Sequence, residues 1–119
     1  MCSYNQINGT FASENKWLLT DVLRNDWGFE GYVMSDWGAV NDRVKGLESG
    51  LELEMPGSNG TNDALIIEAV KNGALKEEVL DQAVERILNI IYKYADHRTP
   101  QEFTMEKDHE EARRIAEES

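Results

Sequence analysis

Apolar and polar residues change spacing several times along the chain, between the period of a strand and that of a helix. Residues 1–5 have the pattern of the end of a strand, residues 32–34 form a short apolar run after Gly31, and residues 51–55 alternate between apolar and acidic side chains. Strict alternation is typical of a strand whose two faces meet different surroundings. The pattern therefore predicts three short strands.

Further segments carry the spacing of helices. They lie at residues 13–26, 39–48, 63–72, 76–94 and 105–118. Residues 76–94 give the clearest pattern, because their apolar side chains form one broad stripe along a helix. Glycines at 28, 50 and 73 follow the first, second and third of these segments, as helix-ending glycines do. Thr61 or Asn62 is expected to cap the helix over residues 63–72.

The order of these elements is strand, helix, strand, helix, strand, helix, helix, with short connections. Such a repeat predicts an α/β fold in which the strands run parallel and the helices cross over between them. Three strands cannot close a (β/α)8 barrel, which takes about 250 residues. An open sheet of three strands would leave two unpaired edges, so the pattern favours a part of a larger architecture.

The charge of the chain excludes several classes of partner. The chain has 119 residues, 12 basic and 23 acidic, and a formal net charge of −11. Nucleic acids and anionic membrane surfaces are therefore not expected as partners, because binding to them needs clustered Lys and Arg. No apolar run reaches the about 18–20 residues that span a bilayer, and no secretory leader opens the chain. Cys2 is the only cysteine, which favours a reducing, cytoplasmic location.

The strongest candidate for chemistry is Asp36, which follows the predicted strand over residues 32–34 and precedes Trp37. A lone acid at the end of a buried strand costs several kcal/mol unless it is paired or used. In α/β sheets and barrels, ligands bind at the carboxyl ends of strands. Trp37 offers a flat apolar face on which a sugar ring can pack. From these residues alone, Asp36 as a cap or turn residue and Trp37 as a packing residue stay open.

The remaining polar residues give weaker signals. Glu52 and Glu54 could form a carboxylate pair, but charges on a solvated or ion-paired strand face are the favoured interpretation. His97 and His109 lie in polar sequence without a neighbouring cysteine, so we expect no metal site there.

Several stretches of the chain form recognisable motifs. They are Met1-Cys2-Ser3-Tyr4-Asn5, Leu23-Arg24, Trp27-Gly28-Phe29-Glu30-Gly31, Ser35-Asp36-Trp37-Gly38-Ala39-Val40 and Gly50-Leu51-Glu52-Leu53-Glu54-Met55-Pro56-Gly57. Together they resemble the family 3 glycoside hydrolases, in the β-glucosidase branch. The resemblance covers nearly the whole chain and implies a fragment of that family's catalytic (β/α)8 barrel. Residues 1–95 would be its last three βα units, and residues 96–119 the linker toward a second domain.

The resemblance implies an α/β fold, a partial TIM barrel with three parallel strands and four to five helices. A rearranged or swapped arrangement in an oligomer stays open. It also implies that Asp36 is the nucleophile of a retaining β-glucosidase, which hydrolyses terminal non-reducing β-D-glucosyl residues. Tyr4 would place its hydroxyl beside that carboxylate, and Met1 and Trp37 would line the sugar subsite. No cofactor or metal is implied.

Two consequences follow for the chain by itself. The resemblance places the general acid/base residue in a later domain, so we expect the isolated chain to be inactive. The alternative is a non-catalytic α/β or helical module that forms a homo-oligomer through an exposed apolar stripe over residues 76–94. A third arrangement, in which another chain supplies the missing parts, is also open. Which sugar or aglycone is preferred is not encoded in these residues.

Overall fold

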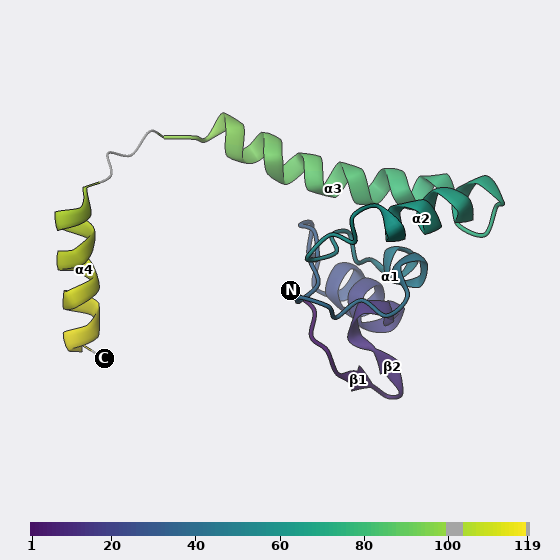
Figure 1. Cartoon of the computed structure of the whole chain (residues 1–119), viewed down its shortest axis with the longest axis horizontal. Coiled ribbons are helices and arrows are strands. Elements are labelled where there is room, and N and C mark those ends of the chain that lie inside the picture. Colours follow the sequence, from purple (N-terminus) through teal and green to yellow (C-terminus); the bar gives the residue numbers. More distant parts are fainter. Residues whose placement is uncertain (100–103, 119) are drawn as a thin grey trace.

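The computed structural model describes residues 1–99 and 104–118. Its elements are β1 (Gln6–Ile7), β2 (Thr10–Phe11), η1 (Ala12–Glu14), η2 (Trp17–Asp26), α1 (Arg43–Ser49), α2 (Thr61–Lys71), α3 (Glu77–Asp96) and α4 (Met105–Glu118). Figure 1 shows β1 to α2 gathered in one body, with the long helix α3 running across it and out beyond it. Most of the described residues are helical.

β1 and β2 form a small antiparallel hairpin, in which Gln6 pairs with Phe11 and Ile7 with Thr10. The two residues between the strands, Asn8 and Gly9, both have positive φ, at 52° and 83°. Two consecutive residues with positive φ are what a type I′ hairpin turn requires, and Asn-Gly is the pair that adopts it most readily. This hairpin is an addition to the elements that hydrophobic spacing predicts.

The three predicted strands are reduced to single bridges. Cys2 pairs with Ser35 and Met34 pairs with Leu53, both in parallel orientation. The segments around these residues therefore lie next to one another in the order 1–5, 32–36, 51–55, which agrees with the predicted direction. Three short strands in these segments are not confirmed, because within residues 1–99 and 104–118 the only strands are the antiparallel β1 and β2.

Charged side chains explain why the strands are so short, because they take over backbone groups that a parallel ladder would use. The N–H of Val33 donates to Glu52 Oε2 at 2.6 Å. The carbonyl of Leu51, which would accept the next ladder bond, instead accepts from Arg43 Nη1 at 3.0 Å. Arg43 Nη2 also donates to the carbonyl of Glu52, at 2.8 Å. The parallel ladder therefore does not continue from Leu53 back to Leu51.

The helix predicted over residues 13–26 forms as two shorter helices, the 3-10 helix η1 and the π-helix η2. Asn15 lies between them, and its side-chain oxygen accepts a hydrogen bond from Leu18 N–H at 3.0 Å. Such a bond satisfies an N–H at the start of a helix, so a second helix begins after Asn15. Gly28, with φ of 68°, follows η2, as predicted.

α1 begins at Arg43 instead of residue 39 because Asp42 caps it, with Oδ1 accepting from Lys45 N–H at 3.0 Å. Gly50 ends α1 with φ of 105°, in the left-handed conformation that the sequence predicts for a stop. Gly73, with φ of 77°, likewise lies just beyond α2.

The cap predicted for α2 is wrong. Gly60 precedes the first residue of the helix, and no side chain at that position accepts a hydrogen bond from it. Asn62 lies inside the helix instead: its N–H donates to Ser58 Oγ at 2.8 Å, and its side-chain amide donates to Glu54 Oε1 at 2.6 Å. Glu54, which lies eight residues earlier in the chain, thus binds the side-chain amide that local reasoning assigned to the helix start.

Two apolar clusters make up the core. Cys2, Leu19, Val33 and Leu51 pack together beneath η2. The second cluster joins α1, α2 and the first half of α3, through Leu47, Ile66, Ala69, Leu75 and Ala83. The apolar stripe predicted over residues 76–94 is therefore buried only in its first half. No residue of α4 is buried, and no helix of residues 1–99 and 104–118 is long and apolar enough to cross a membrane.

Candidate active site

Asp36 lies directly after the bridge residue Ser35, at the start of a tight turn. Its N–H donates to the carbonyl of Cys2 at 3.2 Å, and its own carbonyl accepts from Ala39 N–H at 3.1 Å. The turn passes through Gly38, whose φ of 76° is in the left-handed region that glycine adopts without steric cost. The N–H of Gly38 donates to the carbonyl of Met55 at 3.1 Å, which ties the turn to the neighbouring segment.

The side chains of Asp36 and Tyr4 meet at this turn. Asp36 Oδ1 accepts a hydrogen bond from Trp37 N–H at 2.7 Å. The Tyr4 hydroxyl donates to the carbonyl of Trp37 at 2.8 Å. Partial burial and, secondly, the neighbouring Asp36 carboxylate raise the pKa of the Tyr4 phenol. The structure thus brings Tyr4 and Asp36 together, although Tyr4 itself bonds to the Trp37 backbone.

Trp37 and Met1 both expose large apolar side chains. The indole of Trp37 is 69% exposed, so it presents a face to solvent beside Asp36. Met1 is 80% exposed and lines a hollow whose walls do not include Asp36, Tyr4 or Trp37. A Trp face of this kind can pack on a sugar ring, and the lining role of Met1 stays a prediction.

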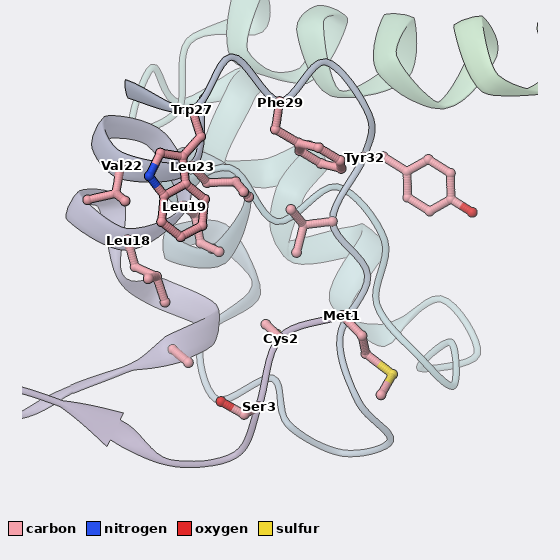
Figure 2. A pocket seen from close by; sticks show the side chains of 12 residues that line it. Met1, Cys2, Ser3, Leu18, Leu19, Val22, Leu23, Trp27, Phe29 and Tyr32 are labelled. Atoms are coloured by element: carbon pink, nitrogen blue, oxygen red, sulfur yellow. The ribbon is translucent and has the colours of Figure 1, made fainter. Parts of the chain in front are cut away.

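The hollow that holds Met1 has a volume of about 370 Å³. Figure 2 shows Leu18, Leu19, Val22 and Leu23 on the coil of η2 facing Met1, Cys2 and Ser3, with Trp27 and Phe29 above them. Asp36, Tyr4 and Trp37 do not line it. Its walls are largely apolar and include no carboxylate, so it does not contribute to the chemistry at Asp36.

Glu52 is the most deeply buried acid of the chain's described part, and its side chain is inaccessible to solvent. Its Oε1 accepts from Arg24 at 2.7 Å and from Arg86 at 2.8 Å, while Oε2 accepts from Val33 N–H at 2.6 Å. Burial lowers the pKa of the Arg24 guanidinium, and the Glu52 carboxylate opposes that change. Of the two sequence-based interpretations, the ion-paired one is confirmed for Glu52.

Among the described residues, no second acid is hydrogen-bonded to Asp36. The Glu54 carboxylate accepts a hydrogen bond from the side-chain amide of Asn62, in the first turn of α2. Within residues 1–99 and 104–118, no group of three His, Cys, Asp or Glu side chains could hold a metal ion. What this arrangement offers chemically is one carboxylate, one phenol and one exposed indole at a single turn.

Sequence reasoning missed one further residue at this site, Ser35. Its side chain is 1% exposed, and its Oγ accepts from Met55 N–H at 2.8 Å and donates to the Met55 carbonyl at 3.3 Å. A small polar residue directly before the candidate acid was the available signal, but its partner lies 20 residues further along the chain. Spacing alone does not connect the two.

Comparison with known proteins decides the family. Residues 1–90 match the Glycosyl hydrolase family 3 N terminal domain, which is most of the chain. The chain belongs to glycoside hydrolase family 3. The resemblance on which the site residues were chosen is thereby confirmed, whereas the role of each residue remains a prediction.

The family 3 relatives are considerably longer than this chain. The chain is 51% identical to the thermostable beta-glucosidase B of Acetivibrio thermocellus, over 100% of this chain and 16% of that protein. It is 50% identical to an exo-alpha-(1->6)-L-arabinopyranosidase of Bifidobacterium breve, over 78% of this chain and 12% of that protein. Among solved structures, the GH3 beta-glucosidase of Bifidobacterium adolescentis superposes with a TM-score of 0.80 at 44% identity, covering 92% of this chain and 16% of that one.

Proposed function

We propose that this chain is the part of a retaining family 3 β-glucosidase barrel that carries the nucleophile, and that Asp36 is that nucleophile. The observation that supports the proposal is the position of Asp36 after a parallel bridge, at a turn shared with Tyr4 and Trp37. The β-glucosidase names of the relatives from Acetivibrio and Bifidobacterium adolescentis support the substrate class. The barrel arrangement and the division into residues 1–95 and 96–119 belong to the same proposal.

The proposed chemistry has two displacement steps. The Asp36 carboxylate attacks the anomeric carbon of a terminal β-D-glucosyl residue, and the bond from that carbon to the aglycone oxygen breaks. The departing oxygen takes a proton from a general acid. Water then attacks the covalent glycosyl-enzyme, loses a proton to the same group acting as base, and releases glucose with retained configuration. An Asp is ionised at neutral pH, so it needs orientation more than activation.

The chain by itself is proposed to lack turnover. A retaining mechanism needs a second carboxyl group about 5–5.5 Å from the first, and we infer that this group is not among residues 1–99 and 104–118. The chain spans 16% of its β-glucosidase relative, and we place the acid/base residue elsewhere in a complete enzyme. The choice of sugar also stays open, because a relative that is 50% identical over 78% of this chain is an exo-alpha-(1->6)-L-arabinopyranosidase.

The experiment uses a substrate that needs no general acid. 2,4-Dinitrophenyl 2-deoxy-2-fluoro-β-D-glucopyranoside has a leaving group acidic enough to depart without protonation, and its fluorine slows release of the glycosyl-enzyme. We expect intact-mass spectrometry to detect one fluoroglucosyl adduct, and peptide mapping to assign it to Asp36. The matched control is Asp36→Asn, which keeps the shape and removes the nucleophile. Absence of an adduct in the unsubstituted chain would contradict the assignment.

Turnover is measured separately, with an aryl β-glucoside whose leaving group does need protonation. We expect release of the phenol at the background rate in both the unsubstituted chain and Asp36→Asn. Turnover that disappears in Asp36→Asn would show that the chain supplies its own acid/base group, and would overturn the proposal of inactivity. Restoration of turnover by the remaining portion of a family 3 enzyme would support an arrangement in which two chains complete the site.

A second candidate function, a self-associating module, is favoured by the second half of α3. Leu88, Ile90, Ile91, Tyr92 and Tyr94 are all exposed there, between 39% and 67%. Contiguous exposed apolar side chains of this kind commonly mark an interaction surface. We propose a second copy of the chain as the occupant, giving a homo-oligomer.

Sedimentation equilibrium tests this with two variants at equally exposed isoleucines. Ile91 on α3 and Ile67 on α2 are each 52% exposed. We expect Ile91→Glu to give a monomer and Ile67→Glu to leave the association unchanged. A monomeric unsubstituted chain would exclude this candidate.

A cytoplasmic location is also proposed, supported by the single, buried Cys2.

A further inference from the structure

The residues on both sides of Asp36 are hydrogen-bonded to one residue, Met55. On one side of Asp36, the hydroxyl of Ser35 bonds to both the N–H and the carbonyl of Met55, at 2.8 and 3.3 Å. On the other side, the N–H of Gly38 donates to the same Met55 carbonyl at 3.1 Å. The backbone around Asp36 is therefore held at both ends by one residue of the neighbouring segment.

The Ser35 hydroxyl takes the place of a backbone group. Ser35 N–H donates to the carbonyl of Leu53 at 2.9 Å, so the next bond of a parallel ladder would run from Met55 N–H to the carbonyl of Ser35. Met55 N–H donates to Ser35 Oγ instead. The hydroxyl thus ends the ladder while keeping Met55 bonded, and the chain is free to turn at Asp36.

The orientation of the Asp36 carboxylate depends on this turn. The hydrogen bond that orients Oδ1 comes from Trp37 N–H, which lies inside the turn between Asp36 and Gly38. If Met55 shifts, the anchor of Gly38 shifts with it, and the Trp37 N–H that holds the carboxylate moves too. Ser35 is 1% exposed, so water does not readily replace its hydroxyl.

We infer that Ser35 is a positioning residue for Asp36, acting through Met55 and the turn over residues 36–38. The inference rests on the proposed nucleophile role, which it deepens. Ser35 touches neither the sugar nor the reacting atoms; it fixes the direction from which the carboxylate reaches them. Positional errors of this kind are costly, because a displacement of about 1 Å can slow a reaction by about a hundredfold.

The test compares two buried serines. Ser35→Ala removes the bonds to Met55. Ser49→Ala removes a comparable buried bond, from Ser49 Oγ to the carbonyl of Glu14 at 2.8 Å, away from the turn. Two readouts are taken in the full chain: the rate of fluoroglucosyl adduct formation, and the pH-dependent shift of the Trp37 amide proton in NMR spectra. The second readout reports the bond from that amide to Asp36 and involves no sugar.

For Ser35→Ala we expect adduct formation to slow by at least about tenfold and the Trp37 amide to lose most of its pH-dependent shift. For Ser49→Ala we expect both readouts to stay as in the unsubstituted chain, even where its thermal midpoint falls. Retention of both readouts in Ser35→Ala would overturn the inference. Absence of any adduct in the unsubstituted chain would count against the nucleophile role alone, because the Trp37 amide still decides the positioning role.

A measurement on the unsubstituted chain covers the case in which Ser35→Ala does not fold. If Ser35, Met55 and the turn form one unit, the amides of Trp37, Gly38 and Met55 open together and share one hydrogen-exchange protection factor. We expect their protection factors to agree. A Trp37 amide that exchanges more than about tenfold faster than the Met55 amide would mean that the turn opens independently, and would refute the inference.

Discussion

At the scale of single residues, the two acids Asp36 and Glu52 differ in the number of groups that hydrogen-bond to their carboxylates. Within the described residues, the Asp36 carboxylate accepts from Trp37 N–H and has the Tyr4 phenol as a neighbour, whereas the Glu52 carboxylate accepts three hydrogen bonds and has no exposure. A buried carboxylate held by two arginines is a structural ion pair, whereas a carboxylate with few donors beside solvent is more available to react. The difference separates the two acids more clearly than their sequence surroundings do.

The first prediction concerns the Tyr4 phenol. Burial and the Asp36 carboxylate raise its pKa above the ordinary 10.0, so it stays neutral to higher pH when folded. Any stability that Tyr4 contributes is present below about pH 10 and is lost as the pH rises through the folded pKa. A phenolate absorbance titration, with Tyr4→Phe as the difference reference, measures it. Asp36→Asn should lower the pKa of Tyr4, and an unchanged value would mean that the two side chains are not neighbours.

The second prediction concerns Glu52. Glu52→Gln leaves Arg24 and Arg86 in a buried place without their shared counter-charge, and we expect the free energy of unfolding to fall by about 3 kcal/mol. Urea denaturation measures the change. Glu111→Gln is the matched control, because Glu111 also pairs with an arginine, Arg114, but on the exposed surface of α4. We expect no measurable loss there, and equal losses at both positions would contradict the network's role.

At the scale of elements, the segments around Asp36 are joined by isolated bridges and turns and not by regular strands. α3 is joined to the bridge segments through Arg86, whose partner Glu52 also bonds to Val33. This charged contact reaches from the helix to the segment next to Asp36. Hydrogen bonds through Glu52 therefore join α3 to the segment that precedes Asp36, although α3 contributes no residue to the site.

The third prediction belongs to the turn after Asp36. Gly38→Ala meets no atom within 4 Å, but its φ of 76° is strained for any residue with a Cβ. We expect a loss of about 1–2 kcal/mol in the free energy of unfolding, together with slower adduct formation at Asp36. Gly57→Ala is the control, since its Cβ would also meet nothing and its φ is not in that region. A neutral Gly38→Ala would show that the turn relaxes without cost.

At the scale of the whole molecule, the fourth prediction follows from the net charge of −11. Repulsion between surface acids destabilises the compact state, and salt screens it. We expect the thermal midpoint to rise as sodium chloride increases from about 0.01 M to about 0.15 M. Potassium chloride should act equally, because the effect is screening and not the binding of one cation. A falling midpoint would mean that ion pairs such as Arg114 with Glu118 outweigh the repulsion.

The sequence anticipated much of this molecule where the cause is local. The helix over residues 105–118 and the stops at Gly28, Gly50 and Gly73 agree with the structure, since each follows from side-chain spacing or from one residue's allowed φ. The strand lengths and the cap of α2 were missed. In both cases a side chain eight residues from its partner, Arg43 or Glu54, takes the backbone or amide group that local reasoning had assigned elsewhere.

What the sequence determined by itself is the family, the positions of the turns, and the one acid that follows a strand-like segment and precedes an indole. Only the tertiary structure decided that Glu52 is enclosed by Arg24 and Arg86, and that the Ser35 hydroxyl is hydrogen-bonded to Met55. The physical reason is one of range. Backbone sterics act between neighbouring residues, whereas burial and hydrogen bonding depend on which distant groups meet where water is excluded.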